Sequence, residues 1–202
     1  MEIRHAAWRR VRGSPVVLML EQADLFLTRW INGPAGNYPL IDDFALVVTH
    51  AAIPMMIFAV AAHWWSHNER RQERQTAVET GLTFILALLV NQAILLFVSR
   101  MRPYDAGVTH LIIAPSSDPS FPSDHATGAI AIIAALWLNN RRQRALLLAL
   151  PAVLLLISRV YVGTHYVSDI IGGAGTALIA ALVIRTTAEI RAPVNAIIIR
   201  FL

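Results

Sequence analysis

The sequence predicts an all-α fold, a polytopic bundle of transmembrane helices. Of the 202 residues, 56% are hydrophobic and only 15% are charged, and the mean hydropathy is +0.54. This apolar share exceeds that of typical soluble globular domains. Several apolar runs also approach the roughly 20 residues that a helix needs to cross a bilayer. The length suits a single domain, residues 1–202.

Six apolar segments, separated by polar loops, predict a six-helix bundle. They are expected at residues 15–31, 44–65, 77–98, 125–138, 145–162 and 169–184. The first segment is interrupted by Glu21, Asp24 and Arg29. It therefore either spans the membrane or lies in the interface as an amphipathic helix. Three glycines in the last segment are expected to allow close helix approach: Gly172, Gly173 and Gly175.

The basic residues are all arginines, and their distribution predicts an orientation. If the first segment spans, one side of the membrane collects Arg4, Arg9, Arg10, Arg12, Arg70, Arg71, Arg74, Arg141, Arg142, Arg144, Arg185, Arg191 and Arg200. That side is expected to be cytoplasmic, because loop arginines accumulate there. The chain is thus expected to be a multi-pass membrane protein with this side inside the cell. The net charge of +4 is therefore better explained by arginines that set the orientation in the membrane than by a nucleic-acid partner.

The opposite side receives Arg100, Arg102 and Arg159, with Arg29 near its boundary. Arginines on the arginine-poor side need another reason to be there, and an anionic ligand outside the cytoplasm supplies one. A guanidinium group stays charged and donates in a planar fork that suits phosphate. The alternative for a lone arginine is snorkelling to lipid headgroups.

Two histidines accompany these arginines. His165 and Asp169 are four residues apart, so on a helix they share a face, and a carboxylate can fix the tautomer of an imidazole. His125 follows Ser123 at the start of another apolar segment, where a helix N-terminus offers free N–H groups to an anion. A structural His–Asp pair and a plain helix cap are the respective alternatives.

Together these groups predict a phosphoryl-transfer site. His165 would attack phosphorus and form a phosphohistidine, and Asp169 would orient it. His125 would protonate the leaving oxygen and then deprotonate the attacking water. The phosphate oxygens would be held by Arg102, Arg159 and Ser123. No metal or other cofactor is expected, because arginines supply the positive charge; zinc held by the histidines and carboxylates is the disfavoured alternative.

The motifs resemble the type-2 phosphatidic acid phosphatase superfamily of integral-membrane lipid phosphatases. Its pattern is Lys-x6-Arg-Pro, then Pro-Ser-x-His, then Ser-Arg-x5-His-x3-Asp. The third part is present from Ser158 to Asp169 and the second at residues 122–125. The first is partial, because Arg102 and the following proline match but the lysine position is Leu95; Arg100 is a candidate replacement. The resemblance covers residues 78–185 and implies a six-helix bundle. It also implies nucleophilic attack by His165, and it adds Ser158 and Arg100 to the expected phosphate-binding residues.

Within that superfamily, the chain resembles the small bacterial undecaprenyl-pyrophosphate phosphatases. The similar stretches are Ser-Phe-Pro-Ser-Asp-His at 120–125, Arg-Met-Arg-Pro-Tyr at 100–104, and residues 158–165. This resemblance implies removal of the terminal phosphate on the outer face, which recycles the lipid carrier for peptidoglycan synthesis. Phosphatidic acid, phosphatidylglycerol phosphate and lipid A phosphates remain alternative substrates. A non-catalytic lipid-binding or transport protein is the alternative of another class, although such a protein would lack a catalytic His or Asp.

Overall fold

The computed structural model describes residues 14–65 and 70–201, and within them it is helical without strands. The elements are α2 (Pro15–Asn32), α3 (Pro39–Ala62), the 3-10 turn η1 (His63–Trp65), α4 (Arg70–Leu95), α5 (Asp124–Leu138), α6 (Arg142–Tyr161), α7 (Val167–Thr186) and α8 (Ala188–Phe201). The arginines expected at positions 4, 9, 10 and 12 lie outside the described residues.

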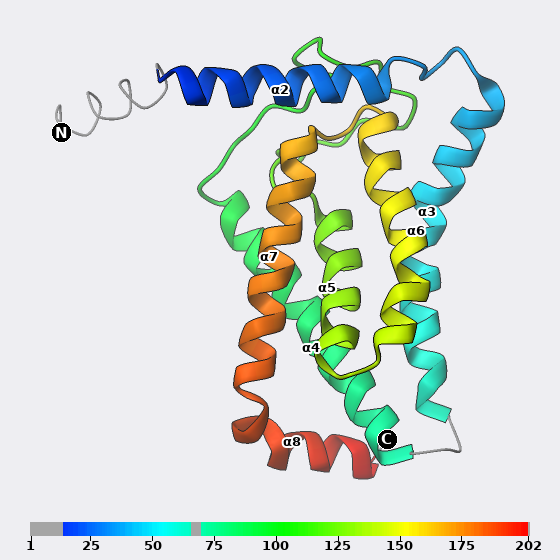
Figure 1. Ribbon diagram of the computed structural model, residues 1–202, viewed down its shortest axis with the longest axis vertical. Coiled ribbons are helices and arrows are strands. Elements are labelled where there is room, and N and C mark those ends of the chain that lie inside the picture. Colours follow the sequence, from blue (N-terminus) through cyan, green and yellow to red (C-terminus); the bar gives the residue numbers. More distant parts are fainter. Residues whose placement is uncertain (1–13, 66–69, 202) are drawn as a thin grey trace, which may run out of the picture.

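Helices α3 to α7 run side by side, whereas α2 and α8 lie across opposite ends of this bundle (Figure 1). Four of the five, α3, α4, α6 and α7, are long and apolar enough to cross a membrane, and α5 is a shorter apolar helix of 15 residues. The predicted all-α, multi-pass bundle is therefore confirmed. The helix count is close to the prediction, because five of the six predicted segments form the bundle and the first, α2, lies across its end.

The orientation of α2 bears on whether residues 15–31 span the membrane or lie in its interface. Along its buried face, Asp24, Thr28 and Asn32 recur every four residues and form hydrogen bonds with the last residue of α6 and the first turn of α7. Its opposite face exposes large apolar side chains, among them Phe26 and Trp30, which are 67% and 70% exposed. A helix with these two faces, placed across the bundle end, has the character of an interfacial helix.

The centre of the bundle is α5, which packs against α4, α6 and α7. Six of its 15 residues are alanine or glycine, so neighbouring backbones approach it closely. A Cβ at Gly173 would lie 2.6 Å from the Ser123 carbonyl oxygen, and one at Gly172 would lie 2.2 Å from the Phe121 ring. The predicted close approach of helices is confirmed at Gly173, whereas Gly172 packs against the Phe121 ring of the preceding loop. It is wrong at Gly175, where a Cβ would meet open space.

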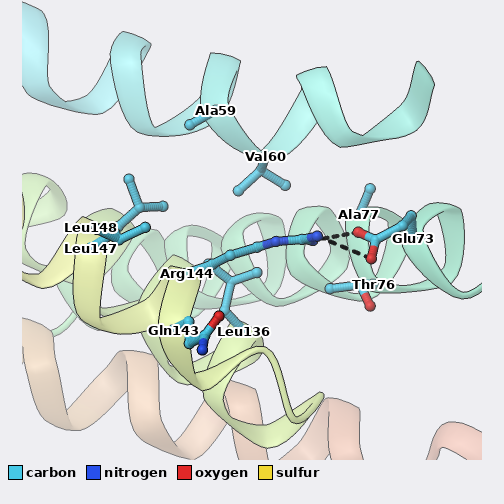
Figure 2. A pocket seen from close by; sticks show the side chains of 10 residues that line it. All are labelled: Ala59, Val60, Glu73, Thr76, Ala77, Leu136, Gln143, Arg144, Leu147 and Leu148. Carbon is cyan, nitrogen blue, oxygen red and sulfur yellow. Dashed lines mark hydrogen bonds and ion pairs between the residues drawn. The ribbon is translucent and has the colours of Figure 1, made fainter. Parts of the chain in front are cut away.

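At the α8 end of the bundle, Glu73 of α4 is 3% exposed and pairs with two arginines. Its Oε1 lies 2.9 Å from Arg141, and both of its oxygens accept hydrogen bonds from Arg144. Figure 2 shows the Arg144 side chain reaching from α6 across a cavity of about 370 Å³ to this carboxylate. These ion pairs connect α4 to the start of α6.

We expect Glu73→Ala to destabilise the protein by about 1–3 kcal/mol, because it removes charge-assisted contacts with two partly exposed arginines, Arg141 and Arg144. Thermal unfolding in detergent micelles measures the loss. Glu21→Ala, on the exposed side of α2, is the matched control and should change stability by less than about 0.5 kcal/mol. Equal effects of the two substitutions would contradict a structural role for the pair.

Candidate active site

The predicted motifs converge at the end of the bundle that α2 covers. Ser123 caps α5, its side chain accepting from the Ala126 N–H at 3.5 Å. Its own backbone N–H donates to the Asp169 carbonyl at 3.1 Å, which joins the start of α5 to the first turn of α7. His165 lies in the connection just before α7 rather than within the helix. The site is thus built from two helix starts and the loops that lead into them.

His165 is 3% exposed and has a defined tautomer. Its Nδ1 lies 2.9 Å from the Ser120 carbonyl oxygen and 3.5 Å from Asp169 Oδ2. A carbonyl oxygen only accepts, so Nδ1 carries the proton and Nε2 keeps a free lone pair. Burial lowers the pKa of His165, against the opposing effect of Asp169, and the charges of Arg159 and Arg102 lower it further. The imidazole is therefore held neutral.

The sequence predicts that Asp169 orients the His165 imidazole. In the structure, the Ser120 carbonyl oxygen is closer to Nδ1 than the Asp169 carboxylate is. Asp169 is fully buried and organises the surroundings of the imidazole instead. Its Oδ2 accepts from the Ser120 hydroxyl at 2.5 Å and from the Tyr166 N–H at 2.8 Å. The sequence motifs do not predict this role of Ser120, although it is the first residue of the stretch 120–125.

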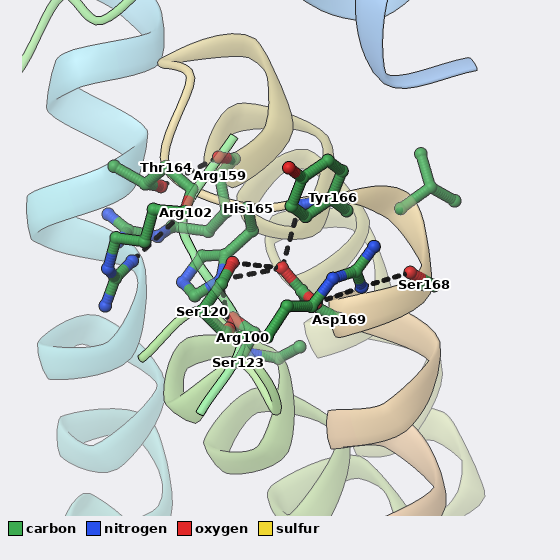
Figure 3. Close-up of polar contacts among 12 residues, drawn as sticks. Arg100, Arg102, Ser120, Ser123, Arg159, Thr164, His165, Tyr166, Ser168 and Asp169 are labelled. Carbon is green, nitrogen blue, oxygen red and sulfur yellow. Dashed lines mark hydrogen bonds and ion pairs between the residues drawn. The ribbon is translucent and has the colours of Figure 1, made fainter. Parts of the chain in front are cut away.

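Arg100 lies on the far side of Asp169 (Figure 3). Its guanidinium donates to Asp169 Oδ1 at 2.6 Å and to Asp24 of α2 at 2.8 Å, and it stacks 3.9 Å over the Tyr166 ring. Burial alone would lower the pKa of Arg100, but the hydrogen bonds and charges of the two carboxylates raise it. The structure therefore commits Arg100 to two carboxylates instead of placing it with the other two site arginines.

Asp24 completes this chain of charges from α2. It also accepts from the backbone N–H of Ser168 at 2.8 Å and from the Ser168 hydroxyl at 2.5 Å. A signal was present in the sequence, since a carboxylate inside an apolar segment usually has a buried partner. Leu95, at the position of the missing lysine, is the half-buried last residue of α4.

Arg102 and Arg159 lie on the other side of His165 (Figure 3). Arg102 is 7% exposed and is aimed by the carbonyls of Asp118 and Thr164, at 2.8 and 3.1 Å. Arg159 is 8% exposed, yet among the described residues its guanidinium forms no hydrogen bond or ion pair, and its Nε is buried without an acceptor. A buried charge left in this state is costly unless an anion joins it.

Arg159 faces a cavity of about 660 Å³ that is also lined by His125, Asp124 and His50. His125 is within electrostatic reach of both Arg159 and His165. Asp124 is held by α4, with its two oxygens accepting from Asn91 at 3.0 Å and Gln92 at 3.2 Å. The predicted acid, His125, and the unpaired Arg159 therefore line the same cavity. Asp124 lines it too, and its hydrogen bonds join α5 to α4.

Ser158 is not brought to that cavity. Its hydroxyl donates to the Leu155 carbonyl at 2.8 Å and lies 3.0 Å from the hydroxyl of Thr49 on α3. Thr49, not Ser158, lines the cavity. Within the described part of the chain, no three His, Asp or Glu side chains are grouped as metal ligands.

The chain is similar to known membrane phosphatases. The family model described as the PAP2 superfamily matches residues 76–192. Undecaprenyl-diphosphatase BcrC of Bacillus subtilis is 31% identical over 170 residues, which make up 84% of this chain and 86% of that relative.

Two solved structures share the fold. The transmembrane PAP2 type phosphatidylglycerolphosphate phosphatase from Bacillus subtilis aligns with a TM-score of 0.65, 19% identity, and coverage of 89% of this chain and 90% of that one. LpxE of Aquifex aeolicus aligns with a TM-score of 0.63, 23% identity, and coverage of 79% and 93%. At these identities the likeness extends to the fold alone.

Proposed function

Since the chain belongs to the PAP2 superfamily of membrane phosphatases, we propose that it removes the terminal phosphate of undecaprenyl pyrophosphate through a phosphohistidine on His165. One observation carries the proposal. Arg159 is a buried cation without an anionic partner among the described residues; it lines one cavity with His125, and its charge acts on His165. A terminal phosphate would supply the missing negative charge.

The reaction has two steps that the two histidines divide between them. Nε2 of His165 attacks the terminal phosphorus, and the bond from that phosphorus to the bridging oxygen breaks. His125 gives its proton to that oxygen, which leaves as undecaprenyl phosphate. His125 then takes a proton from water, the water attacks phosphorus, and the P–N bond breaks to release phosphate. Arg102 and Arg159 hold the equatorial oxygens throughout.

The remaining residues position these groups. Ser120 fixes the tautomer of His165 through its carbonyl, and Asp169 stabilises the imidazolium that forms during attack. Arg100 donates a hydrogen bond to Asp169, and Asp24 in turn accepts one from Arg100. We therefore assign Arg100 and Asp24 to positioning and not to phosphate binding. Ser123 joins α5 to α7 and caps the helix that carries His125.

We expect Asp24→Asn to lower kcat about 10- to 100-fold, because a small displacement of reacting groups has effects of this size. KM should change little, since Asp24 contacts Arg100 and Ser168 and neither of the two arginines assigned to phosphate. Steady-state kinetics on undecaprenyl pyrophosphate separate the two constants, and Glu21→Gln on the exposed side of α2 is the matched control. An increase in KM alone would contradict the positioning role.

Phosphate release from a panel of lipids, with chelator present, tests the function itself. We expect undecaprenyl pyrophosphate to be the best substrate and its rate to be unchanged by chelation, because two guanidinium groups already supply the positive charge. Loss of activity in chelator with recovery on adding zinc or magnesium would contradict the metal-free mechanism. Faster hydrolysis of phosphatidic acid, phosphatidylglycerol phosphate or a lipid A phosphate would reassign the substrate. Release from none of them would favour a lipid-binding protein without catalysis.

We further propose that the site faces the periplasm or cell exterior. Within the described residues, the α8 end of the bundle carries Arg70, Arg71, Arg74, Arg141, Arg142, Arg144, Arg185 and Arg191. The opposite end carries Arg29 and the three arginines of the site. An excess of loop arginine marks the cytoplasmic side.

A further inference from the structure

His50 of α3 lines the cavity that His125 and Arg159 share, and neither step of the proposed reaction uses it. Helix α3 begins at the end of the bundle that α2 covers, so its first turns pass beside the site (Figure 1). The His50 side chain is exposed and lies within electrostatic reach of His125. Ionisable side chains inside spanning helices are rare and mark functional sites, so this histidine calls for a function.

A buried contact between α3 and α6 sets the position of His50. Thr49 is 3% exposed, and its hydroxyl oxygen lies 3.0 Å from that of Ser158. The next residue of each helix, His50 on α3 and Arg159 on α6, lines the cavity. The contact between Thr49 and Ser158 therefore fixes His50 relative to Arg159 within the protein itself.

The imidazole of His50 has one nitrogen bonded and one nitrogen free. Its Nδ1 lies 2.7 Å from the carbonyl oxygen of Leu46, one turn earlier on α3. A carbonyl oxygen only accepts, so Nδ1 carries the proton. Nε2 has no hydrogen-bond partner among the described residues. When Nε2 takes a second proton beside an anion, the imidazolium donates a charge-assisted hydrogen bond to that anion.

A diphosphate needs more positive charge in this cavity than a monophosphate does. Arg102 and Arg159 are assigned to the terminal phosphate. Arg100 is committed to two carboxylates, and Asp124 adds an acidic side chain to the lining of the cavity. The second phosphate, which leaves with the lipid, therefore has no cation of its own unless His50 supplies one.

We propose that His50 binds the second phosphate of a diphosphate and thereby determines specificity for diphosphates over monophosphates. The inference rests on the proposed function, because it assigns a subsite to the phosphate that the reaction leaves on the lipid. The cavity of about 660 Å³ is of the size of small-molecule sites and has room for both phosphates. His50 forms and breaks no covalent bond. As the bond to the bridging oxygen breaks, negative charge grows on the departing phosphate, and the imidazolium stabilises that charge.

Initial rates on farnesyl diphosphate and farnesyl phosphate test the inference, because these two substrates differ by one phosphate only. In His50→Ala, the ratio of kcat/KM for the diphosphate to kcat/KM for the monophosphate should fall about 10- to 100-fold, the effect of one charge-assisted hydrogen bond. His50→Lys returns a cation to this position and should recover part of the ratio. Competitive inhibition gives the same comparison without turnover: His50→Ala should weaken inhibition by methylenediphosphonate by a similar factor, relative to inhibition by inorganic phosphate.

Val47→Ala is the matched control, because Val47 is an exposed residue of α3 that does not line the cavity. Its kinetics should equal those of the parent on both substrates. An unchanged ratio in His50→Ala, whether both rates fall equally or neither falls, would overturn the inference and leave the phosphatase assignment intact. A parent protein that hydrolyses lipid monophosphates but no diphosphate would instead overturn the proposed function, and the role of His50 with it.

Discussion

Replacing His165 with alanine is expected to abolish turnover, lowering kcat/KM on the order of 10⁵-fold, as for removal of other covalent nucleophiles. The expectation follows from the free Nε2 that the Ser120 carbonyl enforces on the buried imidazole. His50, near Arg159, also has its Nδ1 on a backbone carbonyl, that of Leu46, but among the described residues His165 is the histidine that forms an ion pair with a carboxylate, Asp169. The measurement is the initial rate of phosphate release from undecaprenyl pyrophosphate.

Trapping with radiolabelled substrate, followed by alkaline denaturation, tests whether the loss is chemical. His165→Ala should yield no alkali-stable phosphohistidine. His125→Ala loses both the acid of the first step and the base of the second, so it should form the labelled protein more slowly and, once labelled, lose the label more slowly than the parent. His110→Ala, an exposed loop histidine, is the control and should behave as the parent. A near-normal rate in His165→Ala would reject the nucleophile.

Arg159→Met is expected to lower kcat/KM by about 10³-fold, the upper range for loss of one preorganised donor to a developing charge. Thermal stability without substrate should rise, by about 1–4 kcal/mol, because a buried cation without a partner is replaced by an apolar side chain of similar length. Opposite signs for activity and stability are the signature of a ligand-binding charge. Unfolding in detergent and steady-state kinetics give the two values.

Arg159→Lys separates charge from geometry. It keeps the cation but not the planar fork, so its activity should fall between those of the parent and Arg159→Met. Full activity in Arg159→Met would contradict phosphate binding. A loss of stability as large as that expected for Glu73→Ala would mean that the Arg159 guanidinium has a partner in the folded protein.

The sequence predicted the bundle well because each crossing helix has a continuous apolar run. The sequence could not predict the orientation of α2, since Asp24 has the same neighbours along the chain in a spanning and in an interfacial helix. What decides is contact with Arg100 and Ser168, which are distant in the chain. The contacts of Arg100 with Asp24 and Asp169 could not be predicted for the same reason: in an irregular loop, spacing does not set the direction of a side chain.

Ser158 illustrates a second limit. Its place beside Arg159 in the motif suggested a shared role, but successive residues on an α-helix point about 100° apart. Arg159 turns toward the site, whereas Ser158 turns toward Thr49 of α3. His165 and Asp169 were easier to pair, because four residues bring them back to one side whether or not the first lies in the helix.

The crosswise helix α2 has a practical consequence for work with the purified protein. Its outward face carries Val16, Met19, Leu20, Phe26 and Trp30, which lack a protein surface to cover them within the described residues. A medium that solvates the bundle but offers no flat headgroup layer would leave that face unsupported and loosen Asp24 from Arg100. Specific activity should then depend on the solubilising agent, with nanodiscs preserving more of it than small-headed detergents, even where the helical content is the same.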